Sequence, residues 1–353
     1  MLAYFDNIIF SLQRAGGISS VWQNLLRSVT EESGIDPYFL EYREAGKNLF
    51  RQELELAGGR IIPNNGSVQI ERYENPGLRG VDGPFVFHSS YYRYCKNSGA
   101  INFTTVHDFT YEYFVRGMKK RIHQWQKYGA IRNSRAIVCI SENTRRDLFR
   151  FVPEARDKDV HVIYNGVSEE YHVIEGKERE RPDSVLFVGA RSGYKNFRFL
   201  VDGISDTKYN LVICGSPIDE DERLYCDSKL GPDRYVVYSG ISNGMLNELY
   251  NSVHCLVYPS SYEGFGIPVV EAQKSGCPVI ALRASSIPEV IGRTPLMMNE
   301  LNARELKGKL DLLKAESIRQ EVVEEGLMNA SRFSWNKMCR QYLELYNEYV
   351  SPA

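Results

Sequence analysis

Short apolar segments alternate with amphipathic stretches along the chain, and this alternation constrains the fold more than any other feature of the sequence. Ten segments have the length and composition of buried β-strands, at 2–9, 84–88, 102–106, 136–140, 160–164, 184–188, 209–214, 235–238, 253–258 and 278–282. Helical periodicity fills most of the gaps, as at Phe114, Met118, Ile122 and Trp125. Repeated strand–helix alternation predicts an α/β protein with parallel, doubly wound sheets.

The chain is expected to form two domains of similar size. Its 353 residues are more than one hydrophobic core usually holds. A polar, charged and aperiodic stretch at 165–183 divides the strand-like segments into two groups. The last helical stretch, from Trp335 onward, has an apolar face that must pack against one of the two domains.

Composition and charge exclude several classes of protein. A net charge of −2 gives no bulk attraction to nucleic acid, so no nucleic-acid partner is expected. The seven cysteines are an odd number without a Cys-x-x-Cys pair, which argues against disulfides or zinc and fits a reducing cytoplasm. No apolar run approaches the ~18 residues that a membrane-spanning helix needs, and the first residues lack the layout of a signal peptide.

The segment 261–272 carries the most functional information. It follows the strand-like segment 253–258 and places Glu263 before a Gly-Phe-Gly turn, with Glu271 eight residues further on. Strand, glycine turn and helix start together present backbone amides and the positive end of a helix dipole to an anion. The two carboxylates would repel a bare phosphate but suit sugar hydroxyls. A ligand that carries both phosphate and sugar is therefore indicated.

Three other sites follow strand-like segments, where ligands bind in doubly wound sheets. Gly16-Gly17 precedes an amphipathic helix, His107 follows the segment 102–106, and Arg191 and Lys195 lie in a glycine-containing loop after 184–188. Two cations in such a loop suit a diphosphate. Each site also has a plain structural interpretation: a loop-to-helix turn, a structural histidine, and two solvated surface cations.

Two acidic patterns are weaker signals, and one familiar glycine pattern is absent. Asp219-Glu-Asp221 and Asp157-Lys-Asp159 both match the Asp-x-Asp pattern of metal-dependent sugar transferases. Two unrelated matches in one chain show how easily the pattern arises, and acidic residues are expected at helix starts. We therefore expect no metal. The absence of Gly-x-Gly-x-x-Gly argues against a nicotinamide dehydrogenase.

A basic region occupies residues 111–150, with ten Lys and Arg against three acids. A solvated helix face is the simpler interpretation. The alternative is attraction of the segment 116–135, which contains Trp125, to anionic lipid or an anionic acceptor.

Taken together, these residues resemble the family-4 retaining glycosyltransferases, which have the GT-B fold. The resemblance spans nearly the whole chain and is carried by motifs in the family's order: Gly16-Gly17, His107-Asp108, Ser141-Glu142, Tyr164-Asn-Gly-Val167, Gly189-Ala-Arg191 with Lys195-Asn196, Ser239-Gly-Ile241, Glu263 to Glu271, Ile287-Pro-Glu-Val290 and Phe333-Ser-Trp335. One departure is Ala190, which shortens the offset from Arg to Lys to four residues.

The resemblance implies a domain arrangement and a set of roles. Two Rossmann-like domains would face each other across a cleft, with 1–166 plus 335–353 on the acceptor side and 167–334 binding the nucleotide sugar. Arg191 and Lys195 would neutralise the diphosphate, with the amides of Gly16 and Gly17 facing it. Glu263 and the amides of Gly264, Phe265 and Gly266 would bind the sugar, and His107 would lie near the reacting carbon. Glu271 would bind the ribose, and the base would rest on the loop Ser239–Ile241.

The expected function is a retaining, metal-independent glycosyltransferase without a cofactor. It would move a hexose from a nucleotide-diphosphate sugar, with a lean toward GDP-mannose, to a glycan or lipid-linked acceptor in polysaccharide biosynthesis. The chain would be cytoplasmic, with peripheral contact to the inner membrane face through 116–135. Two alternatives remain open. A sugar phosphorylase or epimerase of the same fold would be distinguished by its products. A non-catalytic glycan- or nucleotide-sugar-binding protein would be distinguished by its failure to hydrolyse the donor.

Overall fold

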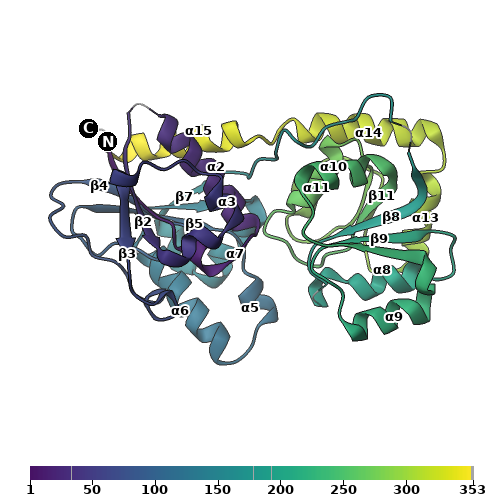
Figure 1. Ribbon diagram of the computed structural model, residues 1–353, viewed down its shortest axis with the longest axis horizontal. Coiled ribbons are helices and arrows are strands. Elements are labelled where there is room, and N and C mark those ends of the chain that lie inside the picture. Colours follow the sequence, from purple (N-terminus) through teal and green to yellow (C-terminus); the bar gives the residue numbers. More distant parts are fainter. Residues whose placement is uncertain (33, 178, 192, 351–353) are drawn as a thin grey trace. The chain divides into compact units, whose positions relative to one another are not determined.

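The computed structural model describes residues 1–32, 34–177, 179–191 and 193–350, and of Val350 only the backbone. The chain divides into two compact units, Met1–Gly166 with Trp335–Ala353, and Val167–Ser334. Each unit contains one parallel β-sheet with helices packed against it (Figure 1). The α/β fold class expected from the alternation of strands and helices is confirmed.

The first unit is built on a seven-stranded parallel sheet. In spatial order its strands are β3 (Ile61–Asn64), β2 (Asp36–Tyr42), β1 (Leu2–Asp6), β4 (Phe85–Ser89), β5 (Ala100–Val106), β6 (Ala136–Cys139) and β7 (Asp159–Val162). The α-helices of this unit are α1 (Ile8–Leu12), α2 (Gly17–Glu31), α3 (Leu49–Gln52), α4 (Val68–Glu71), α5 (Thr110–Phe114), α6 (Met118–Asn133), α7 (Glu142–Phe151) and α15 (Trp335–Val350). The 3₁₀-helices are η1 (Arg43–Lys47), η2 (Gly58–Arg60) and η3 (Pro153–Asp157).

The last helix, α15, completes the core of the first unit. Its apolar face buries Met338, Tyr342 and Tyr346 in the same cluster as Phe5 of β1 and Phe103 of β5. A buried tyrosine needs a partner for its hydroxyl, and the Tyr346 hydroxyl lies 2.5 Å from Nδ1 of His88 on β4. The apolar face that begins at Trp335 therefore packs inside a domain whose other residues lie far earlier in the chain.

The second unit is built on a six-stranded parallel sheet. In spatial order its strands are β10 (Tyr235–Tyr238), β9 (Asn210–Cys214), β8 (Arg181–Val188), β11 (Val253–Tyr258), β12 (Val279–Leu282) and β13 (Met297–Met298). Its helices are η4 (Gly193–Lys195), α8 (Phe197–Ile204), α9 (Glu220–Leu230), η5 (Pro232–Arg234), α10 (Asn243–Ser252), α11 (Ile267–Lys274), α12 (Ile287–Ile291), α13 (Ala303–Leu312) and α14 (Glu316–Ala330). Helices α8 and α9 cover one face of the sheet, and α10 and α11 cover the other (Figure 1).

In both sheets the strand order reverses once, next to the first strand of the unit. The reversal falls between β1 and β4 in the first unit and between β8 and β11 in the second. Open α/β sheets bind ligands at the carboxyl ends of the strands beside such a reversal. The loops after β8 and β11 are therefore where a ligand of the second unit is expected.

The structure differs from the sequence-based expectations at several strand ends. The strand expected at 2–9 ends at Asp6, because α1 starts at Ile8. Strands β2, β3 and β13 were not expected, and β8 begins at Arg181, inside the stretch interpreted as a linker. None of the helices in the described ranges is both long and apolar enough to cross a membrane.

Candidate functional site

Hydrogen bonds join the two loops at the strand reversal of the second unit. Asn196, which has a left-handed backbone with φ of 54°, follows η4 and precedes α8. Its side-chain amide donates to the Pro259 carbonyl and to the Ser261 hydroxyl, both at 2.7 Å. The Ser261 amide in turn donates to the Tyr194 carbonyl at 2.8 Å. The loop after β8 is thus held against the loop after β11.

Lys195 and Glu263 form an ion pair where these loops meet. The two side chains are only 13% and 12% exposed, and Lys195 Nζ also lies 3.4 Å from the Tyr258 hydroxyl. The backbone amide of Glu263 donates to Ser285 Oγ at 2.7 Å, which fixes the backbone from which the carboxylate extends. The sequence predicted both residues as ligand groups, and the structure brings them into direct contact at the carboxyl edge of the sheet.

The Gly-Phe-Gly turn leads from this pair into α11. Gly266 is the N-cap of the helix and has φ of 102°, a conformation that favours glycine. Phe265 is buried edge-on against Phe333, with ring centroids 5.4 Å apart. The Ser286 hydroxyl lies 2.9 Å from the Phe265 carbonyl, which it can donate to. The turn is therefore held by Phe333 and Ser286, which lie outside it. Gly264 lies between Glu263 and Phe265, whose carbonyls both accept from the Ser286 hydroxyl.

Glu271 lies on α11, near the tyrosines of neighbouring elements. The Tyr250 hydroxyl donates to Glu271 Oε2 at 3.1 Å. Burial raises the pKa of Glu271 to about 7, although hydrogen bonds from Tyr250 and Tyr171 act in the opposite direction. The carboxyl group is therefore harder to ionise than an exposed glutamate, and its charge state depends on pH near neutrality.

Arg191 lies in a different environment from Lys195. Its Nε donates to Glu222 Oε2 at 2.9 Å, and its other nitrogens donate to the carbonyls of Ser216 and Pro217 at 3.0 and 2.8 Å. The side chain is only 4% exposed. No contact in the described part of the chain joins Arg191 to the Lys195–Glu263 pair, so the two cations expected to act together are separately engaged.

The acidic patterns have structural roles. Asp219 is the N-cap of α9 and forms a capping box with Glu222, accepting from its amide at 2.8 Å. Asp159 Oδ1 lies 3.0 Å from His161 Nε2, and Asp159 also accepts a hydrogen bond from the Tyr349 hydroxyl. Among the residues that the structure describes, no group of three or more His, Cys, Asp or Glu is placed to hold a metal ion.

The other predicted site residues lie at strand ends or helix starts. Gly16 is the N-cap of α2, and Gly17 is its first residue. Ile241 is half-buried in the short connection between β10 and α10. His107 is buried directly after β5. Burial lowers the pKa of His107 to about 4, with Asp108 acting in the opposite direction, so the imidazole is neutral near pH 7.

A buried ion pair that the sequence does not indicate lies beside His107. Lys127 Nζ lies 2.8 Å from Glu112 Oε2 and 3.0 Å from the Asp108 carbonyl, and both charged side chains are fully buried. Lys127 is therefore not part of the basic surface expected at 116–135. Acidic and basic residues fifteen apart carry no sequence signal that distinguishes this pair from solvated charges.

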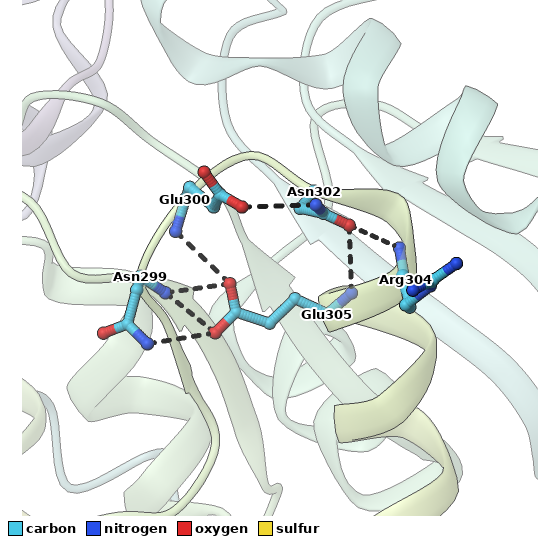
Figure 2. A pocket seen from close by; sticks show the side chains of 5 residues that line it. All are labelled: Asn299, Glu300, Asn302, Arg304 and Glu305. Carbon is cyan, nitrogen blue, oxygen red and sulfur yellow. Dashed lines mark hydrogen bonds between the residues drawn. The ribbon is translucent and has the colours of Figure 1, made fainter.

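A hollow elsewhere in the second unit is stabilised by its own residues. Figure 2 shows that the Glu305 carboxylate accepts from the amides of Asn299 and Glu300, at 3.0 and 3.3 Å. Asn302 accepts from the amide of Arg304 at 2.8 Å and caps α13. Asn302 thus caps the helix and Glu305 holds the loop before it, so this hollow has a structural explanation.

Comparisons with known proteins agree with this architecture. Residues 168–326 match the family described as Glycosyl transferases group 1, and residues 15–171 match Glycosyltransferase Family 4. The O-antigen chain mannosyltransferase B of Escherichia coli is 27% identical over 270 residues, which are 69% of each chain. An uncharacterized glycosyltransferase of Methanocaldococcus jannaschii is 32% identical over 231 residues, which cover 62% of this chain and 61% of the relative.

Solved structures show the same fold at low sequence identity. Sucrose-phosphate synthase from Thermosynechococcus elongatus has a TM-score of 0.77 at 16% identity, with 100% of this chain and 99% of that chain covered. Anabaena HepE in complex with UDP and glucose has a TM-score of 0.71 at 13% identity, with 98% of each chain covered.

The two matched families cover both units, and the parallel α/β units are those of GT-B proteins. The chain therefore belongs to the family-4 glycosyltransferases and has the GT-B fold.

The turn before α11 gives a first prediction. Gly266→Ala should destabilise the second unit by about 1–3 kcal/mol, because a side chain strains the left-handed backbone and crowds its neighbours. An added Cβ would lie 2.8 Å from Ile287 Cδ1. Gly308→Ala, inside α13 with open space around it, should instead stabilise by about 0.5–1 kcal/mol. Urea unfolding of both variants tests this, and equal effects would contradict it.

Proposed function

We propose that the chain is a retaining hexosyltransferase of polysaccharide biosynthesis. It moves a hexose from a nucleotide-diphosphate sugar to a glycan or lipid-linked acceptor, with GDP-mannose as the first candidate donor. The mannosyltransferase among its relatives supports the sugar and the pathway. The UDP bound to HepE makes a uridine nucleotide the second candidate.

The Lys195–Glu263 pair is the observation that carries this proposal. A nucleoside diphosphate is a good leaving group and needs charge stabilisation more than a proton. Lys195 supplies a positive charge at the edge of the sheet where ligands bind. Glu263, fixed beside it, offers a carboxylate to the hydroxyls of the transferred sugar. The pair thus combines a phosphate-binding cation with a sugar-binding acceptor group.

The reaction needs no general acid from the protein. The acceptor hydroxyl would attack from the face that the diphosphate leaves, and the leaving phosphate would take the hydroxyl proton, which retains configuration. His107, neutral at physiological pH, would exchange hydrogen bonds with the sugar near the reacting carbon. The amides of Gly16 and Gly17 at the start of α2 would add partial positive charge toward the diphosphate.

The remaining donor-binding residues would hold the ends of the nucleotide sugar. The amides of Gly264, Phe265 and Gly266 would contact the sugar, Glu271 would accept from the ribose hydroxyls, and Ile241 would contact the base. Arg191 would reach the diphosphate only by releasing Glu222 and two carbonyls. We therefore assign the larger share of phosphate binding to Lys195.

Substitutions in the ion pair test the proposal. Lys195→Ala should lower the transfer rate about 10²–10³-fold, as loss of one oxyanion-stabilising group does in other enzymes. Glu263→Gln should lower the rate while largely preserving nucleotide affinity. The matched control Lys208→Ala removes an exposed lysine of the same unit and should retain wild-type turnover. Rates would be measured from nucleotide release and products by NMR, with GDP-mannose and UDP-glucose as donors.

Four results, from these rates and products and from the same assay with orthophosphate or EDTA added, would contradict the proposal. Wild-type turnover in Lys195→Ala would remove the phosphate-binding role, and a product with inverted anomeric configuration would exclude retention. Sugar phosphate formed from orthophosphate would indicate a phosphorylase. Loss of activity in EDTA would contradict metal independence.

Glu271 gives a prediction about pH. Its pKa of about 7 means that the carboxylate, which can accept from both ribose hydroxyls, forms as the pH rises through neutrality. Donor affinity should therefore fall about tenfold for each pH unit below about 7. GDP-mannose is a suitable ligand because its diphosphate diester does not titrate there. Calorimetry should show this dependence in wild type and a flat, weaker profile in Glu271→Gln. If the donor affinity of Glu271→Gln still fell with pH as that of wild type does, the assignment of Glu271 to ribose binding would be contradicted.

We also propose cytoplasmic location with peripheral contact to an anionic membrane surface. The surface of α6 exposes Met118 (66%), Ile122 and Trp125 (61%). Exposed Lys119 and Arg121 lie on the same helix. Apolar side chains beside cations suit the interface of a bilayer that contains anionic lipid.

Vesicle binding tests the membrane proposal. Wild type should sediment with phosphatidylglycerol-containing vesicles more than with phosphatidylcholine vesicles, and Trp125→Ala with Met118→Ala should reduce this binding. Met328→Ala removes an equally exposed methionine from α14 (61% exposed) and should leave binding unchanged. Equal sedimentation of wild type and the double variant would overturn the proposal.

A further inference from the structure

A second hollow, of about 550 Å³, lies within the first unit, and its lining includes Gln13, whose side chain lies against Gly16. Its walls are the end of α1, the loop that follows it, and the 3₁₀-helix η1. These segments follow β1 and β2, so the hollow lies at the carboxyl edge of the first sheet, where doubly wound domains bind ligands. Its volume is in the range of small-molecule sites.

The polar side chains around this hollow have no partners among the described residues. Ser11, Gln13, Arg14, Glu44 and Lys47 all line it, and none of their side chains makes a hydrogen bond or ion pair within those ranges. Ser11 Oγ and Glu44 Oε2 are also shielded from solvent. Polar atoms that are buried without partners destabilise a protein unless something else satisfies them.

The hollow of Figure 2 provides a contrast within the same chain. There, Asn299, Glu300, Asn302 and Glu305 bond to one another and to the start of a helix. In the hollow beside Gly16, the polar side chains do not bond to one another. Arg14 and Lys47 are exposed to solvent, whereas Ser11 Oγ and Glu44 Oε2 are shielded from it and have no partner among the described residues. Helix capping does not account for these two atoms, and a bound ligand would satisfy them.

The chemistry of the lining selects the class of ligand. Arg14 and Lys47 only donate hydrogen bonds, a carboxylate such as that of Glu44 only accepts them, and Ser11 and Gln13 do both. Hydroxyl groups donate and accept, so a sugar ring can satisfy every one of these groups. A phosphate could bond to the two cations, but its oxygens would face the Glu44 carboxylate. Half-buried Leu12 adds an apolar surface for the C–H face of a ring.

We propose that this hollow binds a neutral, hydroxyl-bearing sugar residue of the acceptor, and that Glu44 and Lys47 select it. The inference rests on the proposed transferase function and adds to it the class of acceptor and the residues that recognise it. Because all the residues lie in the first unit, sugar binding here is separable from nucleotide binding by the second.

Saturation-transfer NMR on the full chain without nucleotide tests the inference. The probes are methyl α-glycosides of mannose, glucose, galactose, rhamnose and N-acetylglucosamine, with inorganic phosphate titrated separately by ³¹P NMR. At least one glycoside should bind wild type, and Glu44→Gln and Lys47→Met should each weaken it about tenfold, the loss expected for a hydrogen bond to a charged group. Arg43→Ala, which removes an exposed cation of η1 outside the lining, should bind as wild type does.

Each other outcome overturns the inference. These outcomes are no glycoside binding by wild type, glycoside binding that neither variant weakens, and phosphate binding that Lys47→Met abolishes in place of sugar binding. Circular dichroism verifies that the variants fold. Calorimetry with GDP and UDP on the same preparations separates the two hypotheses: nucleotide binding without sugar binding defeats only this inference, and sugar binding without nucleotide binding defeats only the proposed function.

Discussion

The contact between Lys195 and Glu263 is the interaction on which the functional interpretation depends. It joins the loops that follow β8 and β11, the strands between which the order of the second sheet reverses. Removing two charges from water is costly, so a poorly exposed pair needs neighbours that fix its geometry. Asn196 ties the two loops together, and Ser285 holds the backbone of Glu263. The pair is thus positioned before any ligand arrives, which lowers the entropic cost of binding one.

The sequence was sufficient for the fold class and the family, because strand–helix alternation and ordered motifs report on them directly. It was insufficient for strands whose burial depends on neighbours. The segment Asp36–Tyr42 contains a proline and two acids and so lacks a clear strand pattern, yet it forms β2 and pairs in parallel with β1 through five residues. The strand expected at 2–9 was too long, because the apolar residues from Ile8 onward belong to α1. Periodicity alone does not separate a buried strand from a short buried helix.

The candidate site shows a similar division. Glycines and carboxylates in a short motif, such as Glu263 and Gly266, could be found from sequence because their spacing is itself the signal. Contacts between residues far apart in the chain could not be found from the sequence. Arg191 bonds to Glu222, thirty-one residues away, and Lys127 pairs with Glu112 inside the first unit. The hollow beside Gly16 is lined by residues that follow two different strands, β1 and β2, so no single segment of the sequence indicates it. Its unsatisfied polar groups are visible only once the chain is folded.

The central claim is that the second unit binds a nucleoside diphosphate through Lys195. Thermal unfolding of wild type and Lys195→Ala with GDP, UDP, ADP, free nucleosides and orthophosphate tests it most directly. The account predicts that one nucleoside diphosphate stabilises wild type, by about 2.7 kcal/mol at 100 times its dissociation constant. It also predicts a much smaller shift in Lys195→Ala and with the nucleoside or orthophosphate alone. The account would be contradicted if no nucleoside diphosphate stabilised wild type, or if Lys195→Ala responded as wild type does.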